Sequence, residues 1–150
     1  MTLIKQCLKG FTNKIGNINN QIHSLAVDLG LRYLCRFHKI KDIENQVKSV
    51  NRIAGKGFDL KIVDNNKKLI IGEVKTTNPK NNQDLGKQQK EEIIKDLKRI
   101  NEFDTIDHNK YFFVISSKAK RILKNKYAYL INKINVINIL EVMGKTKKIN

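Results

Sequence analysis

Two short apolar runs separated by a polar turn restrict the fold of this chain more than any other feature. Residues 58–63 and 69–77 are rich in β-branched and apolar residues, which favour extended strands. Between them lies Asp64-Asn65-Asn66-Lys67, and asparagine tolerates the left-handed conformation that tight turns need. The sequence therefore predicts a β-hairpin that is symmetric about Asn66.

Hydrophobic periodicity predicts the elements around this hairpin. Apolar residues recur every three to four positions in three segments, which are expected to be helices: 18–37, 85–103 and 117–130. Three further runs are expected to be strands: 43–50, 111–116 and 135–142. Gly30, inside the first helix, lowers helix propensity or lets another element approach closely.

This order of elements predicts an α/β fold with a mixed central sheet and helices on both faces. Only one proline interrupts the chain, and no repeat or linker is visible. We therefore expect a single domain over residues 1–150, with its core at about 18–142 and a basic tail at 144–150.

The chain carries a large excess of positive charge. Thirty Lys and Arg residues face fourteen Asp and Glu residues, which gives a formal net charge of +16. Such an excess favours an anionic partner, most commonly nucleic acid. An AT-rich genome, which enriches Lys, Asn and Ile, is an alternative source of part of it.

Other broad classes are disfavoured. Cys7 and Cys35 match no zinc spacing, so both are expected to be free thiols in a reducing compartment. No apolar run approaches the ~20 residues of a membrane span, and Lys5 and Lys9 interrupt any secretory signal. The expected location is the cytoplasm, without a membrane partner.

The hairpin gathers the residues that can carry chemistry. Glu73 and Lys75 are two apart in one strand and share a face. Asp59 lies opposite Glu73, since each is seven residues from Asn66. Two such carboxylates repel one another unless a cation intervenes, and Mg²⁺ binds one or two carboxylates and keeps several waters. We predict that Asp59, Glu73 and the Val74 carbonyl bind Mg²⁺, for which Mn²⁺ can substitute.

Gly57-Phe58-Asp59, followed after thirteen residues by Glu73-Val74-Lys75, resembles the PD-(D/E)xK nuclease superfamily, the fold of many restriction endonucleases. The resemblance covers roughly half the chain and includes Gln88-Gln89-Lys90, Asp96-Leu97 and residues 110–114. It implies a restriction-endonuclease-like αβββαβ core in which two acids bind magnesium and the lysine serves the attacking water. Catalytic roles then fall on Asp59, Glu73 and Lys75.

The chain departs from that pattern in two places. Phe58 replaces the proline that precedes the first acid, and the first helix lacks the glutamate that many members use as an extra metal ligand. Asp28 on that helix, or Glu44 beyond it, is a candidate substitute. His23 on the same helix, like His38 and His108, shows no paired metal spacing and is predicted to be packed or exposed instead.

Several polar residues are candidates for contact with the DNA backbone, although an ordinary solvated surface explains most of them as well. They lie after the second hairpin strand, on the second long helix and in a basic run near residue 120: Thr76, Thr77, Gln88, Lys90, Lys118, Lys120, Arg121 and Lys124.

Taken together, these features predict a Mg²⁺-dependent DNA endonuclease of the restriction type. Two-strand cutting needs two active sites, so a homodimer is expected, and a partner subunit or a cognate methyltransferase fits the same system. A junction resolvase or a nicking repair nuclease is the alternative within this fold. A basic DNA- or RNA-binding module without catalysis is the alternative from another class.

Overall fold

The computed structural model describes residues 3–42, 44 and 57–145, with side chains from residue 17 to residue 143 of those ranges. A long helix, α1 (Leu3–Phe37), precedes the hairpin strands β1 (Leu60–Val63) and β2 (Leu69–Lys75). The remaining elements are, in order, α3 (Lys87–Glu102), the 3₁₀ turn η1 (Asp107–Asn109), β3 (Lys110–Val114), α4 (Ser117–Lys126), α5 (Ala128–Ile131), β4 (Asn135–Asn138) and α6 (Ile139–Lys145).

The hairpin has the predicted register. Leu60 pairs with Gly72 and Val63 with Leu69, so the strands are symmetric about Asn66 as expected. At the turn, one carboxylate oxygen of Asp64 accepts hydrogen bonds from the backbone N–H groups of Asn66 and Lys68, each at 2.8 Å. The residue in the left-handed conformation is Lys67, at φ 61°, rather than an asparagine. The Asp64 side chain therefore closes the turn and holds Lys67 there.

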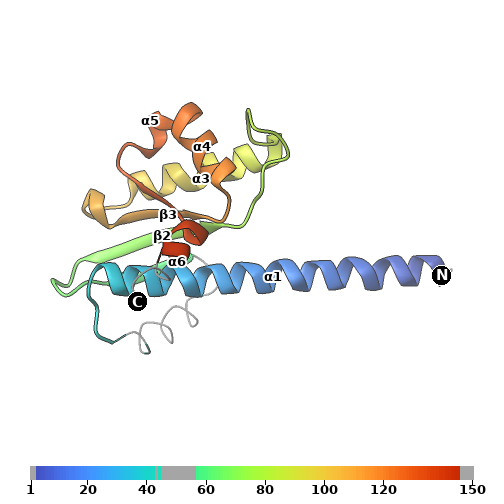
Figure 1. Ribbon diagram of the computed structural model, residues 1–150, viewed down its shortest axis with the longest axis horizontal. Coiled ribbons are helices and arrows are strands. Elements are labelled where there is room, and N and C mark those ends of the chain that lie inside the picture. Colours follow the sequence, from blue (N-terminus) through green and yellow to red (C-terminus); the bar gives the residue numbers. More distant parts are fainter. Residues whose placement is uncertain (1–2, 43, 45–56, 146–150) are drawn as a thin grey trace.

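Four strands form one mixed sheet in the order β1-β2-β3-β4. β1 runs antiparallel to β2, whereas β2, β3 and β4 are parallel to one another. Figure 1 shows α3, α4 and α5 on one face of the sheet and α1 and α6 on the other. The predicted α/β class, with a mixed sheet between helices, is confirmed.

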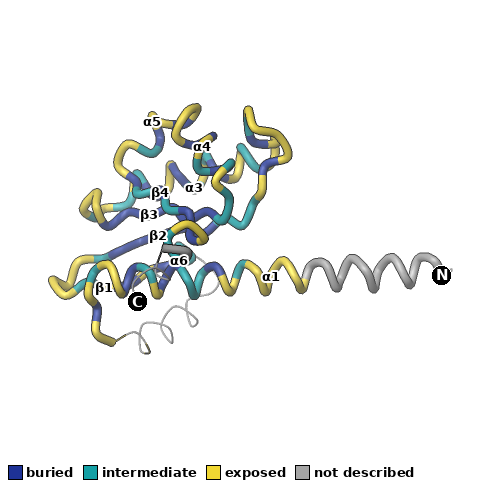
Figure 2. Tube along the Cα trace, in the orientation of Figure 1, coloured by how far each residue is buried: buried dark blue, intermediate teal, exposed yellow. Residues whose placement is uncertain are grey.

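The central strands are buried on both faces, which gives two apolar cores (Figure 2). Along β3, Phe112 and Val114 pack under α3 and α4, while Tyr111 and Phe113 pack under α1. α1 approaches the sheet closely at Gly30, where a Cβ atom would lie 3.1 Å from Leu60 Cδ1. This confirms the interpretation that Gly30 lets another element, here the sheet, approach the helix closely.

Some predicted boundaries were wrong. The first helix begins earlier, at Leu3, and the helix expected at 117–130 is divided at Tyr127. The strand expected at 135–142 ends at Asn138, whose side-chain oxygen accepts the Leu140 N–H at 3.1 Å and begins α6. Such a cap favours a helix start over a continued strand.

Two predictions fall largely outside the described residues. Of the strand expected at 43–50, only Glu44 is among the described residues. Of the basic tail expected at 144–150, the described residues end at Lys145. Among the helices of the described ranges, none offers a stretch that is both apolar and long enough for a bilayer span.

Candidate active site

Asp59 and Glu73 face each other at the open end of the hairpin. Asp59 immediately precedes β1, and continuing the observed register places it across from Glu73. One carboxylate oxygen of Asp59 accepts the Val74 N–H at 2.9 Å, which ties the residue to β2. Glu73 is only 3% exposed. The predicted pair of acids is therefore brought together, and one of its members is buried.

The proximity of the two acids changes their protonation. Burial, followed by the negative charge of Asp59 and a side-chain hydrogen bond with it, raises the pKa of Glu73 to about 8, although Arg99 acts in the opposite direction. Burial also acts to raise the pKa of Asp59, but hydrogen bonds with His23, the Val74 backbone and Glu73 outweigh it and lower that pKa. Without a cation, the pair holds one proton at neutral pH.

Lys75 joins this group from the same strand face. Its Nζ lies 2.7 Å from Asp96 Oδ2, and both side chains are mostly buried. Burial lowers the pKa of Lys75, but the hydrogen bond and charge of Asp96 and the charges of Glu73 and Asp59 raise it overall. Lys75 is therefore held as a cation next to the two acids.

Helix α3 supplies two residues that the sequence did not assign to the site. Asp96 pairs with Lys75, and the Arg99 guanidinium donates to the Glu73 carboxylate. Arg99 also lies 3.4 Å from Asp96 and stacks over the Phe58 ring at 5.0 Å. Arg99 therefore spans the site and is not confined to a solvated helix face. The i,i+3 spacing of Asp96 and Arg99 is the only local signal for it.

His23 of α1 is the third residue that the sequence did not assign to the site. Its Nε2 lies 3.4 Å from Asp59 Oδ2. The hydrogen bond to Asp59 raises the pKa of His23, against an opposing effect of burial, and the Val74 backbone adds to the increase. The first helix therefore does contribute a group to the site, but an imidazole rather than the carboxylate expected from Asp28.

The other predicted metal ligands lie elsewhere. The carboxylate of Asp28 pairs with Arg32 on its own helix at 2.8 Å, and Glu44 is exposed. Among the described residues, no three His, Cys, Asp or Glu side chains converge closely enough to enclose an ion. The carboxylates of Asp59 and Glu73 match the donors of a hydrated Mg²⁺ ion, which takes one or two carboxylates and keeps several waters.

The predicted DNA-contacting residues lie beyond β2, on α3 and on α4. Thr76 and Thr77 are half-buried beyond β2, and Gln88 is exposed on α3. Lys90 lies over the Tyr127 ring at 5.8 Å, Lys118 donates to the Pro79 carbonyl, and Lys120 pairs with Glu141. Arg121 and Lys124 are exposed on α4.

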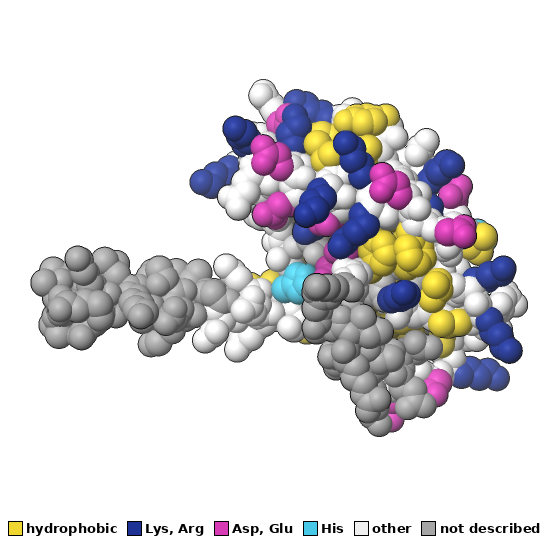
Figure 3. Space-filling model, turned by 180° about the vertical axis from the view of Figure 1, so that it is seen from behind, with side chains coloured by type: hydrophobic (Ala, Val, Ile, Leu, Met, Phe, Trp, Pro, Cys, Tyr) yellow, Lys and Arg dark blue, Asp and Glu magenta, His cyan; other side chains and the backbone are white. Residues whose placement is uncertain are grey.

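On the face shown in Figure 3, Lys and Arg are spread over the body of the molecule with Asp and Glu among them.

Comparisons with protein-family models, with curated proteins and with solved structures found no match to this chain.

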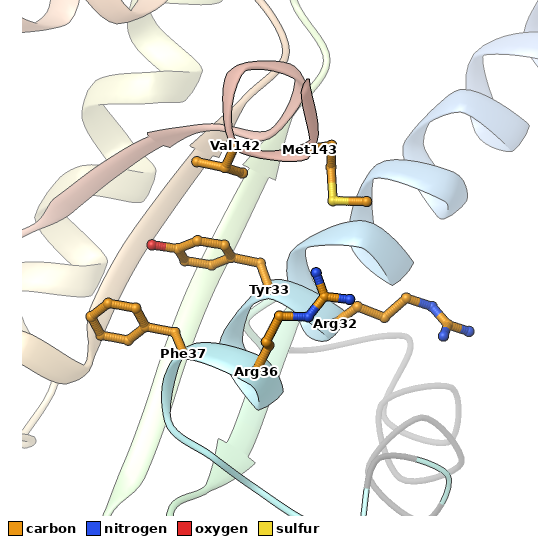
Figure 4. Close-up of a pocket in the computed structure, with 6 residues that line it drawn as sticks. All are labelled: Arg32, Tyr33, Arg36, Phe37, Val142 and Met143. Carbon is orange, nitrogen blue, oxygen red and sulfur yellow. The ribbon is translucent and has the colours of Figure 1, made fainter. Parts of the chain in front are cut away.

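A separate apolar hollow of about 240 Å³ lies between α1 and α6 (Figure 4). It is lined by Tyr33, Phe37, Val142 and Met143, with Arg32 and Arg36 at its side. None of these residues belongs to the group around Glu73. The hollow is therefore distinct from the candidate active site.

The raised pKa of Glu73 predicts how stability depends on pH in the cation-free protein. The folded state keeps a proton that the unfolded chain releases above pH 4.5, so stability falls as pH rises from there to about 8. Glu73→Gln removes this titration. We expect denaturant unfolding in the presence of chelator to show a smaller loss of stability from pH 5 to pH 8 in Glu73→Gln than in the wild type.

His23, whose pKa is also raised, pairs with Asp59 and contributes to the pH dependence of both proteins. Glu102→Gln, at an exposed position of α3, is the matched control and should behave as the wild type does. Equal pH dependence in the wild type and Glu73→Gln would contradict a raised pKa at Glu73.

Proposed function

We propose that this protein is a metal-dependent nuclease that hydrolyses phosphodiester bonds in DNA. The observation that carries the proposal is the hairpin geometry, in which Asp59 lies across from buried Glu73 and Lys75 follows two residues later on the same face. The particular class we propose is a PD-(D/E)xK endonuclease of the restriction type, acting as a homodimer with Mg²⁺ or Mn²⁺.

Asp59, Glu73 and the Val74 carbonyl would hold the cation. When bound, such an ion lowers the pKa of a coordinated water and neutralises charge that develops on a phosphate. The two acids are suited to this role because burial and the charge of Asp59 raise the pKa of Glu73 to about 8, even though Arg99 lies beside it. With a divalent cation bound, both carboxylates would be ionised and would hold it.

The raised pKa of Lys75 favours a role as a fixed positive charge over a role as the base that deprotonates water. A lysine that keeps its proton cannot accept one from the attacking water. Lys75, positioned by Asp96, instead orients the water and stabilises negative charge on the phosphate. Arg99 of α3 also stabilises negative charge on the phosphate, because its guanidinium lies against Glu73 and remains partly exposed.

The net charge of +16 supports DNA as the substrate. Contacts of Lys and Arg with phosphates give sequence-independent affinity that falls with salt. Exposed Arg121 and Lys124 are available for such contacts. Recognition of a particular sequence needs side chains at base edges, and these are not assigned.

Incubation of supercoiled plasmid with the purified protein tests the proposal. We expect nicked and then linear product in Mg²⁺ or Mn²⁺ and none with chelator. Discrete fragments from long linear DNA would support the restriction type, whereas selective cutting of four-way junctions would replace it with a resolvase. DNA binding without cleavage in any divalent cation would overturn the nuclease proposal and favour a binding module.

His23 is expected to support cation binding by orienting Asp59, because hydrogen-bond partners of metal ligands typically change affinity 10–100-fold when removed. At pH 8, His23→Ala should weaken Mn²⁺ binding about 10-fold, measured by titration calorimetry. His108→Ala, at an exposed histidine of η1, is the control and should leave the affinity unchanged. Equal affinities in all three proteins would show that His23 has no such role.

A further inference from the structure

The first helix carries an uninterrupted heptad repeat. Large apolar residues alternate at spacings of three and four over its first 27 positions, as the a and d positions of a coiled coil do. The a positions are Leu8, Ile15, Ile22 and Leu29, and the d positions are Ile4, Phe11, Ile18 and Leu25. A period of 3.5 residues, rather than 3.6, is what a helix needs to supercoil around another helix.

This seam is open along the described part of the helix. The backbone is helical from Leu3, and Figure 1 shows the N-terminal half of α1 extending well beyond the body of the molecule. Ile18, Ile22 and Leu25 are 53%, 42% and 60% exposed, respectively. Figure 2 shows α1 as largely exposed over residues 17–25, before the helix reaches the sheet. Three large apolar residues in one row are more than the isolated ones usual on a surface.

Among the described seam residues, Leu29 is partly buried against the core, whereas Ile18, Ile22 and Leu25 are exposed. The residues that pack α1 onto the sheet lie beside the seam and turn away from it towards the C-terminus, and they include Ala26, Gly30 and Leu34. At the next two seam positions after Leu29 stand Arg32 and Arg36, both exposed. The apolar repeat therefore ends where the helix becomes part of the body.

We propose that this seam pairs with the same seam of a second copy of the chain to form a two-stranded coiled coil. The two surfaces match because all eight a and d positions carry large apolar residues. The few charges beside the seam favour self-association there, whereas the high positive charge of the whole chain opposes it on other surfaces. The eight flanking e and g positions carry only Lys5, Lys14 and Asp28 as charged residues, in a chain whose net charge is +16.

This pairing goes beyond the proposed nuclease function and does not depend on it. It assigns the dimer surface to α1 and does not use His23, which lies outside the a and d positions. Sedimentation or light-scattering mass measurements on the full chain test it without DNA or metal. The wild type should have twice the mass of the 17.4 kDa chain.

Leu25→Glu should weaken the dimer at least about 100-fold, because it places a charge in the seam without a partner. Leu140→Glu is the matched control: the same substitution at a helical leucine that is 59% exposed but lies on α6. It should remain dimeric. Circular dichroism should show that both variants keep the fold, since neither side chain belongs to a core.

Three outcomes would overturn the proposal. The first is a wild type with the mass of one chain, which would leave the seam to a different partner. The second is a folded Leu25→Glu variant that stays dimeric. The third is dissociation of the Leu140→Glu control, which would place the interface on α6.

Discussion

Asp59→Asn and Glu73→Gln are each expected to reduce metal-dependent cleavage of DNA by about 1000-fold, since each removes a charge that holds the cation. Both substitutions keep the size of the side chain, so the hairpin should fold. The amide introduced by Asp59→Asn retains an oxygen that can accept the Val74 N–H, as the Asp59 carboxylate does at 2.9 Å. The measurement is the initial rate of plasmid cutting at saturating Mg²⁺.

DNA binding provides the internal reference for these two variants. In chelator the two acids already hold one proton between them, so each substitution changes their total charge by at most one unit, and DNA affinity should stay equal or rise slightly. Asp104→Asn and Glu102→Gln, both at exposed positions, are matched controls and should cut as the wild type does. Cleavage at the wild-type rate in Glu73→Gln would exclude this site as the catalytic one.

Lys75→Ala is expected to slow cleavage about 100- to 1000-fold, because a fixed cation near developing phosphate charge contributes a factor of that order. In contrast to Asp59→Asn, it should leave Mg²⁺ affinity unchanged or make it tighter, since it removes a positive charge beside the cation site. Calorimetric Mg²⁺ titration and the cleavage rate, measured on the same samples, separate the two roles.

Lys75→Arg provides a second comparison. It keeps the positive charge and the pairing with Asp96, and should recover part of the lost rate if Lys75 acts as a cation. If Lys75 were the base, Lys75→Arg would be as slow as Lys75→Ala. Lys68→Ala, at an exposed position of the same hairpin, is the control.

The arrangement of charge explains why these residues are grouped as they are. Glu73 is buried against Asp59 and would be costly as an isolated anion. Arg99 and Lys75 offset part of that cost, and Asp96 holds Lys75 in turn. Natural proteins tolerate such strained groups of charge mainly where they serve a function.

The sequence by itself determined the hairpin, its register and therefore the pairing of Asp59 with Glu73. These are local consequences of a two-residue period and a short turn, which act within fewer than about 20 residues of chain. It also determined the heptad repeat of α1, because a helical seam is a property of spacing alone.

Only the tertiary structure decided which distant groups complete the site and which surfaces remain open. His23, Asp96 and Arg99 reach the hairpin through the packing of α1 and α3 on opposite faces of the sheet. The same packing leaves Ile18, Ile22 and Leu25 exposed. The helix end at Tyr127 and the cap at Asn138 likewise went unpredicted, because apolar periodicity does not record where a side chain meets a backbone group.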